Sequence, residues 1–269
     1  MGYSCPLVLL CLLLLLSGGC ARQPWTQPVD QDQAKAIREM IEKKRTADEA
    51  CSSTLDAEVI VSMKTLMDTK SFSGFLQVKL PSSVKFVTTN PLGQTLFALV
   101  SDGQSYRSVN TLESQFVSGG LAALAIRNDL PPELLEGQWG VWLSDRIELP
   151  QNAEITDIRQ DAGARGVWIR LAKPGNITTV GEYILINPAD RRLLARVLMD
   201  ADENTIARID YSDWQGGESC GQPTGFHISN VSRGVEITIH LSGLITNKIL
   251  TERDFSLRPP PGYFIKLLP

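Results

Sequence analysis

Histidines and cysteines are the residues of this chain that could carry chemistry. The 269 residues include five cysteines and two histidines, His227 and His240, and both histidines fall in strand-like runs. No His-Glu-x-x-His, Walker or Cys-x-x-Cys pattern occurs, and residues 217–221, which match the letters Gly-x-Ser-x-Gly, lie in a Gly-rich turn rather than at a nucleophile elbow. A periplasmic hydrolase built on Ser219-Cys220 and a distant histidine is disfavoured, because flexible glycines flank that pair. We therefore expect a protein that is not an enzyme and that holds no metal or cofactor.

The composition is that of a globular chain with a small acidic excess. Hydrophobic residues make up 43% of the sequence, and the formal net charge is −4. Nucleic-acid binding requires a surplus of Lys and Arg on one face, and 26 basic residues against 30 acidic ones do not supply it. We expect no nucleic-acid partner.

The first twenty residues have the pattern of a processed leader. Residues 7–16 are all apolar, which is too short for a bilayer-spanning helix but fits the apolar region of a signal peptide. Small residues at positions 17–19 precede Cys20, an arrangement that resembles the bacterial lipobox. The resemblance implies that residues 1–19 are removed and that Cys20 receives a diacylglycerol group. A secreted protein cut near Gly19 and a short membrane anchor remain alternatives.

Residues 20–29 are expected to form a lipidated tether, because they are polar and contain two prolines. Ala21 follows the cysteine, whereas an aspartate there retains lipoproteins of enteric bacteria in the inner membrane. The sequence thus predicts a lipid-anchored protein on the periplasmic leaflet of the outer membrane of a Gram-negative bacterium.

Cys51 and Cys220 are the cysteines that remain if Cys20 is acylated. In an oxidising compartment two such cysteines are expected to pair. We predict a Cys51–Cys220 disulfide that ties the end of the first helix to a late Gly-rich turn. Two free thiols are the alternative.

One amphipathic helix and many short strands are predicted for residues 30–269, which we read as one domain. Residues 34, 37, 40, 41 and 44 follow helical spacing, and Asp30 can cap the helix that spans about 30–50. Alternating runs separated by turn signals then predict a mainly β fold with an antiparallel sheet. These runs are 55–64, 72–80, 84–89, 95–100, 106–110, 154–160, 166–171, 182–187, 192–199, 205–211, 226–231 and 235–241. Between them, residues 119–126 predict a small apolar helix that must be buried or face something apolar.

In this order of elements the chain resembles the LolA/LolB superfamily of bacterial lipoprotein carriers and receptors. The echoes lie at residues 59–61, 75–78, 84–86 and 99–103, and residues 255–262 resemble the closing strand and Pro-Gly ending of that superfamily. The resemblance implies an incomplete antiparallel barrel with a helical lid, enclosing an apolar cavity for acyl chains. An anchored member would bind acyl chains of lipoproteins or lipids, receive them from a periplasmic carrier protein and help to insert them into the outer membrane.

Alternation along the strands selects the residues expected to line that cavity. They are Val59, Val61, Met63, Phe86, Leu96 and Val100 from the sheet, with Leu121 and Leu124 from the lid. Leu134 and Leu135, together with Trp139 and Trp142 on a predicted strand, are candidates for the cavity mouth or for membrane contact. The alternative function is a structural envelope lipoprotein with a solid interior, which docks a protein partner through its sheet.

Overall fold

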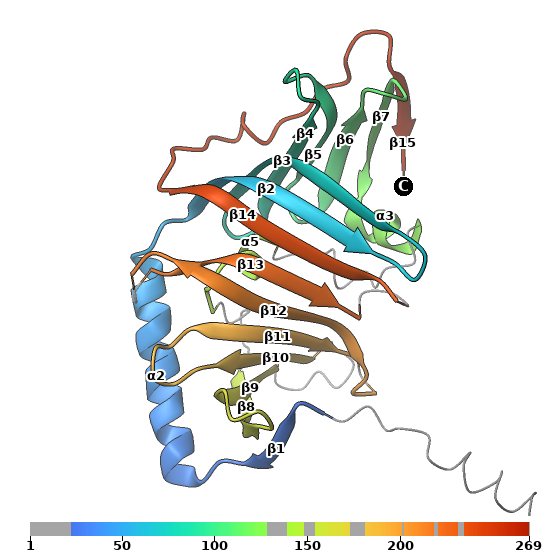
Figure 1. The fold of residues 1–269 in the computed structure, drawn as a ribbon. Coiled ribbons are helices and arrows are strands. Elements are labelled where there is room, and N and C mark those ends of the chain that lie inside the picture. Colours follow the sequence, from blue (N-terminus) through green and yellow to red (C-terminus); the bar gives the residue numbers. More distant parts are fainter. Residues whose placement is uncertain are drawn as a thin grey trace, which may run out of the picture.

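The computed structural model describes residues 23–127, 139–147, 154–172, 181–200, 202–217, 220–230 and 234–268. Within these residues the chain is mainly β, with one long open sheet and few helices (Figure 1). The helices are α2 (Gln31–Glu49), α3 (Leu121–Arg127) and the single turn α5 (Trp139–Trp142).

The described strands form one sheet, in which neighbouring strands are antiparallel except for the last pair, β7 and β15. Its order is β1-β8-β9-β10-β11-β12-β13-β14-β2-β3-β4-β5-β6-β7-β15. The strands of the first half of the chain are β1 (Trp25–Pro28), β2 (Thr54–Lys64), β3 (Thr69–Lys79), β4 (Ser83–Thr89), β5 (Thr95–Ser101), β6 (Ser105–Asn110) and β7 (Gln115–Gly120). Those of the second half are β8 (Glu154–Asp161), β9 (Val167–Ala172), β10 (Gly181–Ile186), β11 (Leu193–Met199), β12 (Thr205–Gln215), β13 (Gln222–Ser229), β14 (Glu236–Thr246) and β15 (Phe264–Leu267).

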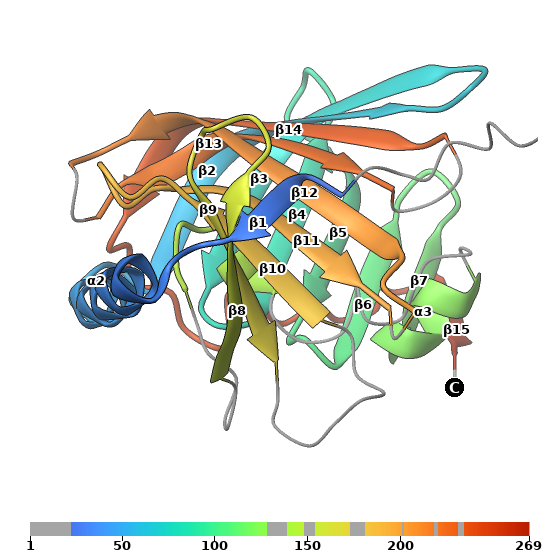
Figure 2. The ribbon, with the colours of Figure 1, turned by 90° about the horizontal axis from the view of Figure 1, so that it is seen from below.

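Helix α2 begins where the sequence predicted it. The side chain of Asp30 accepts a hydrogen bond from the backbone N–H of Gln33 at 2.8 Å, which satisfies one of the free donors of the first turn. Ile37 and Ile41 are buried in the main core together with Leu55, Val59 and many other apolar side chains. Helix α2 therefore closes one side of the curved sheet, and Figures 1 and 2 show it beside the ends of the strands and opposite α3.

The two faces of the sheet are covered unevenly. We call the face that carries Val59 the inner face, and the opposite one the outer face. Helix α3 and the segment 139–147 pack on the inner face. On the outer face, β1 covers β9–β11, because Trp25 stacks on Tyr183 at 4.1 Å between ring centroids and meets Trp168 edge-on.

Three sequence-based expectations about elements are wrong. Trp25–Pro28 was expected to lie in the tether, but it is strand β1, held by the burial of Trp25. Trp139 and Trp142 were placed on a strand, but their i, i+3 spacing belongs to the helical turn α5. The closing strand was expected within 255–262, whereas those residues are turn and coil and the strand follows at Phe264–Leu267.

Candidate functional site

Half-buried apolar side chains line the inner face where β13, β14 and β2–β5 adjoin. Register places Val61 between Ile239 of β14 and Phe72 of β3, and it places Met63 beside Ile237. Phe86 lies opposite Leu99 in the next pair of strands. We call this set the inner strip: Val61, Met63, Phe72, Phe86, Leu99, Ile228, Ile237 and Ile239. Phe72 remains 46% exposed, so this part of the inner face is apolar but incompletely covered.

The predicted cavity residues separate into three groups: those in or beside the inner strip, those in a cluster around α3, and two that lie on the outer face. Val61, Met63 and Phe86 belong to the inner strip, and Val59 lies beside them, fully buried in the main core. Leu121 and Leu124 of α3 join a second cluster with Tyr106 of β6 and Leu198 of β11. Helix α3 thus contacts strands from both halves of the sheet across its inner face.

The inner-face placement of Leu96 and Val100 is wrong. Val100 pairs with Lys85, so it shares the outer face, while its neighbour Leu99 points inward with Phe86. Leu96 lies on the same face of β5 as Val100, next to an irregularity in the register of the β4–β5 pair. The run 95–100 is apolar at nearly every position because both of its faces are covered. The outer side is covered by the C-terminal segment, where Phe255 borders a small pocket that Val100 also lines.

The segment 139–147 is held to the inner face by a set of polar contacts that we call the polar clamp. Tyr211 donates to the carbonyl of Trp142 at 3.0 Å, and Gln222 donates to that of Leu143 at 2.6 Å. The guanidinium of Arg196 donates to the carbonyl of Arg146 and pairs with Glu182. Gly140 contributes by shape, because an added Cβ would lie 2.6 Å from the carbonyl oxygen of Pro81. The segment 139–147 therefore covers the inner face over β10–β13, and the inner strip lies next to the covered area.

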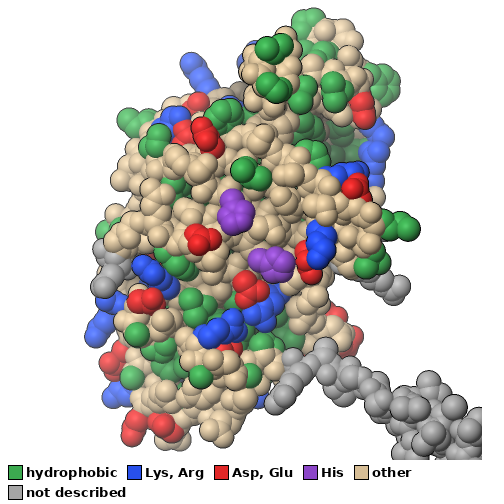
Figure 3. Space-filling view, in the orientation of Figure 1, with side chains coloured by type: hydrophobic (Ala, Val, Ile, Leu, Met, Phe, Trp, Pro, Cys, Tyr) green, Lys and Arg blue, Asp and Glu red, His purple; other side chains and the backbone are tan. Residues whose placement is uncertain are grey.

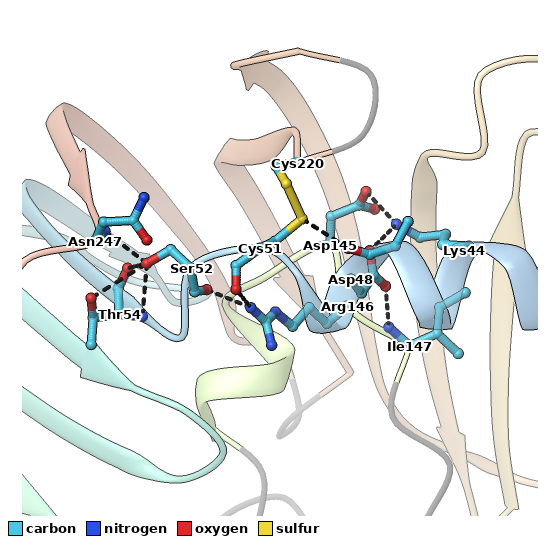
Figure 4. Close-up of a disulfide and its surroundings, with 11 residues drawn as sticks. Lys44, Asp48, Cys51, Ser52, Thr54, Asp145, Arg146, Ile147, Cys220 and Asn247 are labelled. Carbon is cyan, nitrogen blue, oxygen red and sulfur yellow. Dashed lines mark hydrogen bonds and ion pairs between the residues drawn. A yellow bond between two sulfur atoms is a disulfide. The ribbon is translucent and has the colours of Figure 1, made fainter.

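Buried charges complete the polar clamp at its α2 end (Figure 4). The ammonium of Lys44 lies 2.8 Å from a carboxylate oxygen of Asp145 and 3.2 Å from one of Asp48. Asp145 also accepts the backbone N–H of Leu193 at 2.7 Å. Burial raises the pKa of Asp145 to about 6, although Lys44 opposes the shift. Burial likewise raises the pKa of Asp48 against the same ammonium.

The predicted disulfide is confirmed. Cys51 and Cys220 are joined with their Cα atoms 5.5 Å apart. Arg146 donates to the carbonyls of Cys51 and Ser52 at 2.6 and 2.5 Å, so the disulfide adjoins the polar clamp (Figure 4). A pocket of about 130 Å³ opens here. It is smaller than the roughly 300–1,000 Å³ typical of ligand pockets, and it is distinct from the inner strip.

The two histidines lie on neighbouring strands, His227 on β13 and His240 on β14. His227 and His240 both lie exposed on the outer face (Figure 3). Among the residues that the structure describes, no three His, Cys, Asp or Glu side chains gather as metal ligands. No helix in the same part of the chain is long and apolar enough to cross a membrane.

The predicted mouth residues are only partly described. Trp139 and Trp142 are half-buried on α5 and contact both apolar clusters, so they pack between the clamp and α3. Leu134 and Leu135 lie outside the described residues, as does Cys20.

An exposed apolar tip was not foreseen. The β2–β3 hairpin projects beyond the neighbouring strands (Figure 2), and its turn exposes Leu66 and Met67, the latter by 99%. Lys64 and Lys70 flank the turn on the two strands. The sequence does carry a sign of this tip, since the turn contains two adjacent apolar residues and no Gly or Pro.

Comparison with known proteins gives the fold. No family model matches the sequence, and no curated protein matches it. Among solved structures, a DUF1329 family protein from Desulfovibrio piger superimposes with a TM-score of 0.58 at 16% identity, over 86% of this chain and 98% of the other. A LolA superfamily protein from Nitrosomonas europaea and a putative outer membrane lipoprotein-sorting protein domain from Vibrio parahaemolyticus both give 0.54. Their identities are 12% and 13%, over 82% of this chain and 97% of theirs.

The chain therefore has a LolA-like fold, a large curved open sheet with few helices. The resemblance read from the sequence is confirmed at the level of the fold.

Proposed function

We propose that this protein is a lipoprotein of the outer membrane, anchored through Cys20, that binds acyl chains on the inner strip and helps to place lipoproteins or lipids in the membrane. The observation that carries the proposal is the incompletely covered inner strip beside α3. The likeness of this protein's fold to that of a putative outer membrane lipoprotein-sorting protein domain supports the same proposal.

Binding on the inner strip requires no covalent chemistry. Each CH₂ group removed from water contributes about 0.8 kcal/mol, so six such groups supply roughly 5 kcal/mol. The inner strip offers branched and aromatic side chains on adjacent strands, and movement of α3 would enlarge the space available. Leu121 and Leu124 act as the lid in this proposal, and Trp139 and Trp142 border the mouth.

The β2–β3 turn is the proposed point of membrane contact among the described residues. Leu66 and Met67 would enter the acyl region, while Lys64 and Lys70 would meet anionic head groups. Figures 1 and 2 show the start of β1 on the same side of the molecule as this turn, opposite α2. A short tether from Cys20 to β1 is therefore compatible with a turn that faces the anchoring membrane.

A matched pair of variants on one strand tests acyl binding. Phe72 points to the inner face and Phe75 to the outer face of β3, and they are exposed by 46% and 49%. Phe72→Ser should weaken uptake of a fluorescent fatty acid or an acylated peptide by about tenfold, whereas Phe75→Ser should leave it unchanged. Native mass spectrometry of the purified protein should also find about one co-purified lipid per chain.

The outcome separates the two functions. If the protein carries no lipid and takes up no acylated peptide, the acyl-binding proposal fails, and a structural lipoprotein that docks a protein partner becomes the better account.

Membrane contact by the β2–β3 turn is tested separately. Met67→Asp should reduce binding to vesicles that contain anionic lipid. Leu92→Asp, in the β4–β5 turn and 84% exposed, is the control.

A further inference from the structure

Strand β15 forms one end of the sheet in the part of the chain that the structure describes. Among those residues it is bonded to β7 on one side only, in parallel. The backbone N–H groups of Phe264 and Leu268 donate to the carbonyls of Ser114 and Ser118, both at 2.8 Å. Because strand residues alternate in direction, the N–H and C=O groups of Ile265 and Leu267 point away from β7. They form a short row of donors and acceptors that can accept another strand.

This edge contains no proline and is mostly apolar. Phe264, Ile265 and Leu267 are each more than half exposed, and Lys266 is the one charged residue of the strand. Leu112, in the turn before β7, adds another exposed apolar side chain at the same end. Edge strands in soluble proteins are usually blunted by charge, proline or a covering element.

The opposite end of the sheet is protected. Strand β1 ends at Pro28, which has no backbone N–H to donate, and shows an irregular register with β8. Its one large apolar side chain, Trp25, is buried against the sheet. A head-to-tail contact, in which β15 of one molecule pairs with β1 of the next, is therefore disfavoured.

We propose that the β15 edge binds the β15 edge of a second copy of this chain, in a two-fold antiparallel pair centred on Ile265. In this register Ile265 faces its own counterpart, and Phe264 of each copy faces Lys266 of the other. Tyr263 then faces Leu267, so apolar contacts flank the centre. Shifting the pair by one residue, so that Ile265 faces Leu267, would set the two Lys266 ammonium groups opposite each other.

The position of the edge is compatible with a membrane anchor. Strands β1 and β15 are at the two ends of the strand order, so a β15 pair leaves the start of β1 free in both copies. The inner strip also lies away from the edge, on β13, β14 and β2–β5. Dimer formation and acyl binding are thus separate properties that can be tested separately.

Cysteine cross-linking distinguishes this register from other contacts. In a hydrogen-bonded antiparallel pair, directly opposed Cα atoms lie about 5.5 Å apart, within the roughly 4.4–6.8 Å that a disulfide needs. Ile265→Cys should therefore give a reductant-sensitive dimer when membranes of the producing cells are oxidised. Leu267→Cys, on the same edge and also exposed, is the matched control. Its two copies would lie roughly 13 Å apart, and we expect at least fivefold less dimer.

A charge variant supplies the second measurement. The full chain with its own N-terminus, solubilised in mild detergent, should sediment as a dimer. Ile265→Lys should convert it to a monomer by opposing two like charges, whereas Leu92→Lys should not. Equal cross-linking from positions 265 and 267, or a monomer at every concentration, would overturn the proposal. Cross-linking of position 265 to a different protein, with none to itself, would instead assign the edge to a partner's strand.

Discussion

Lys44 of α2 lies 2.8 Å from the carboxylate of Asp145, a residue of the polar clamp that follows it by 101 positions. The same ammonium contacts Asp48 one turn along the helix. One positive charge thus joins two buried carboxylates and connects α2 to the segment that fills the inner face. The arrangement makes this segment sensitive both to the loss of Lys44 and to pH.

Replacing Lys44 with methionine should destabilise the protein strongly. The substitution leaves Asp48 and Asp145 buried without a counter-ion, and breaking a buried ion pair from one side costs about 3–5 kcal/mol. The cost should be smaller at pH 5 than at pH 8, because the carboxylates can then take up protons. Denaturant unfolding of the variant and the wild type at both pH values measures this loss of unfolding free energy. Lys43→Met, at an exposed neighbouring position, should change the unfolding free energy by well under 1 kcal/mol.

Asp145 should make stability fall as the pH rises. Its pKa is about 6 in the folded state, against an ordinary aspartate value of 3.8, so the native state retains a proton that the unfolded chain has lost. The free energy of unfolding therefore decreases from about pH 4 to pH 7, by at most about 3 kcal/mol from this residue. Asp145→Asn keeps an acceptor for the N–H of Leu193 but does not titrate. The stability of Asp145→Asn relative to wild type should consequently rise over that interval, and a flat difference would contradict the assignment.

The helix and most strands could be predicted because local physics determines them. Helix α2 has an apolar stripe and a capping Asp30, and both features act within a few residues of the chain. Most strands show alternation between turn signals. Strands β1 and β15 could not be found this way, since each has four residues and pairs with a strand far away in the sequence. Strand β7 pairs with the adjacent β6, but it ends in Ser-Gly-Gly and shows no clear alternation.

The candidate site was only partly readable for the same reason. Val61, Met63 and Phe86 fall on one face because each alternates with polar or exposed neighbours. Val100 does not, because the C-terminal segment covers its outer side and removes the contrast between the faces. The polar clamp pairs residues such as Lys44 and Asp145 across most of the fold, and no local pattern records that pairing.

Strand β1 should depend on one side chain. Trp25 is buried between Tyr183 and Trp168, and removal of a buried tryptophan costs about 3–5 kcal/mol where the surroundings cannot collapse. Trp25→Ala should release β1 from β8 and expose the β1–α2 junction to protease, with a loss of unfolding free energy near the lower end of that range. Thr26→Ala, on the exposed side of the same strand, is the control. Equal protease resistance of the two variants would show that β1 is held mainly by its backbone.

Asp161 should contribute stability that is lost in acid. Burial raises its pKa, but hydrogen bonds from Arg165 and Trp168 outweigh that effect and hold the pKa at about 2. The unfolded chain therefore binds a proton before the native state does, and the free energy of unfolding falls by about 2 kcal/mol between pH 4 and pH 2. Asp161→Asn should remove this dependence and leave the Asp145 dependence at higher pH intact. Loss of both slopes in one variant would mean that the two residues do not titrate independently.

The Cys51–Cys220 disulfide should be a major source of global stability. It spans 169 positions, and the chain-entropy model assigns about 5 kcal/mol to a loop of this length, with about 2–4 typical of measured bridges. Cys51→Ser and Cys220→Ser should lower the unfolding free energy equally, and the double variant should be no worse than either single one. Reductant should bring the wild type to the same denaturation midpoint and leave all three variants unchanged. A clear difference between the two single variants would contradict the assignment of the lost stability to the cross-link alone.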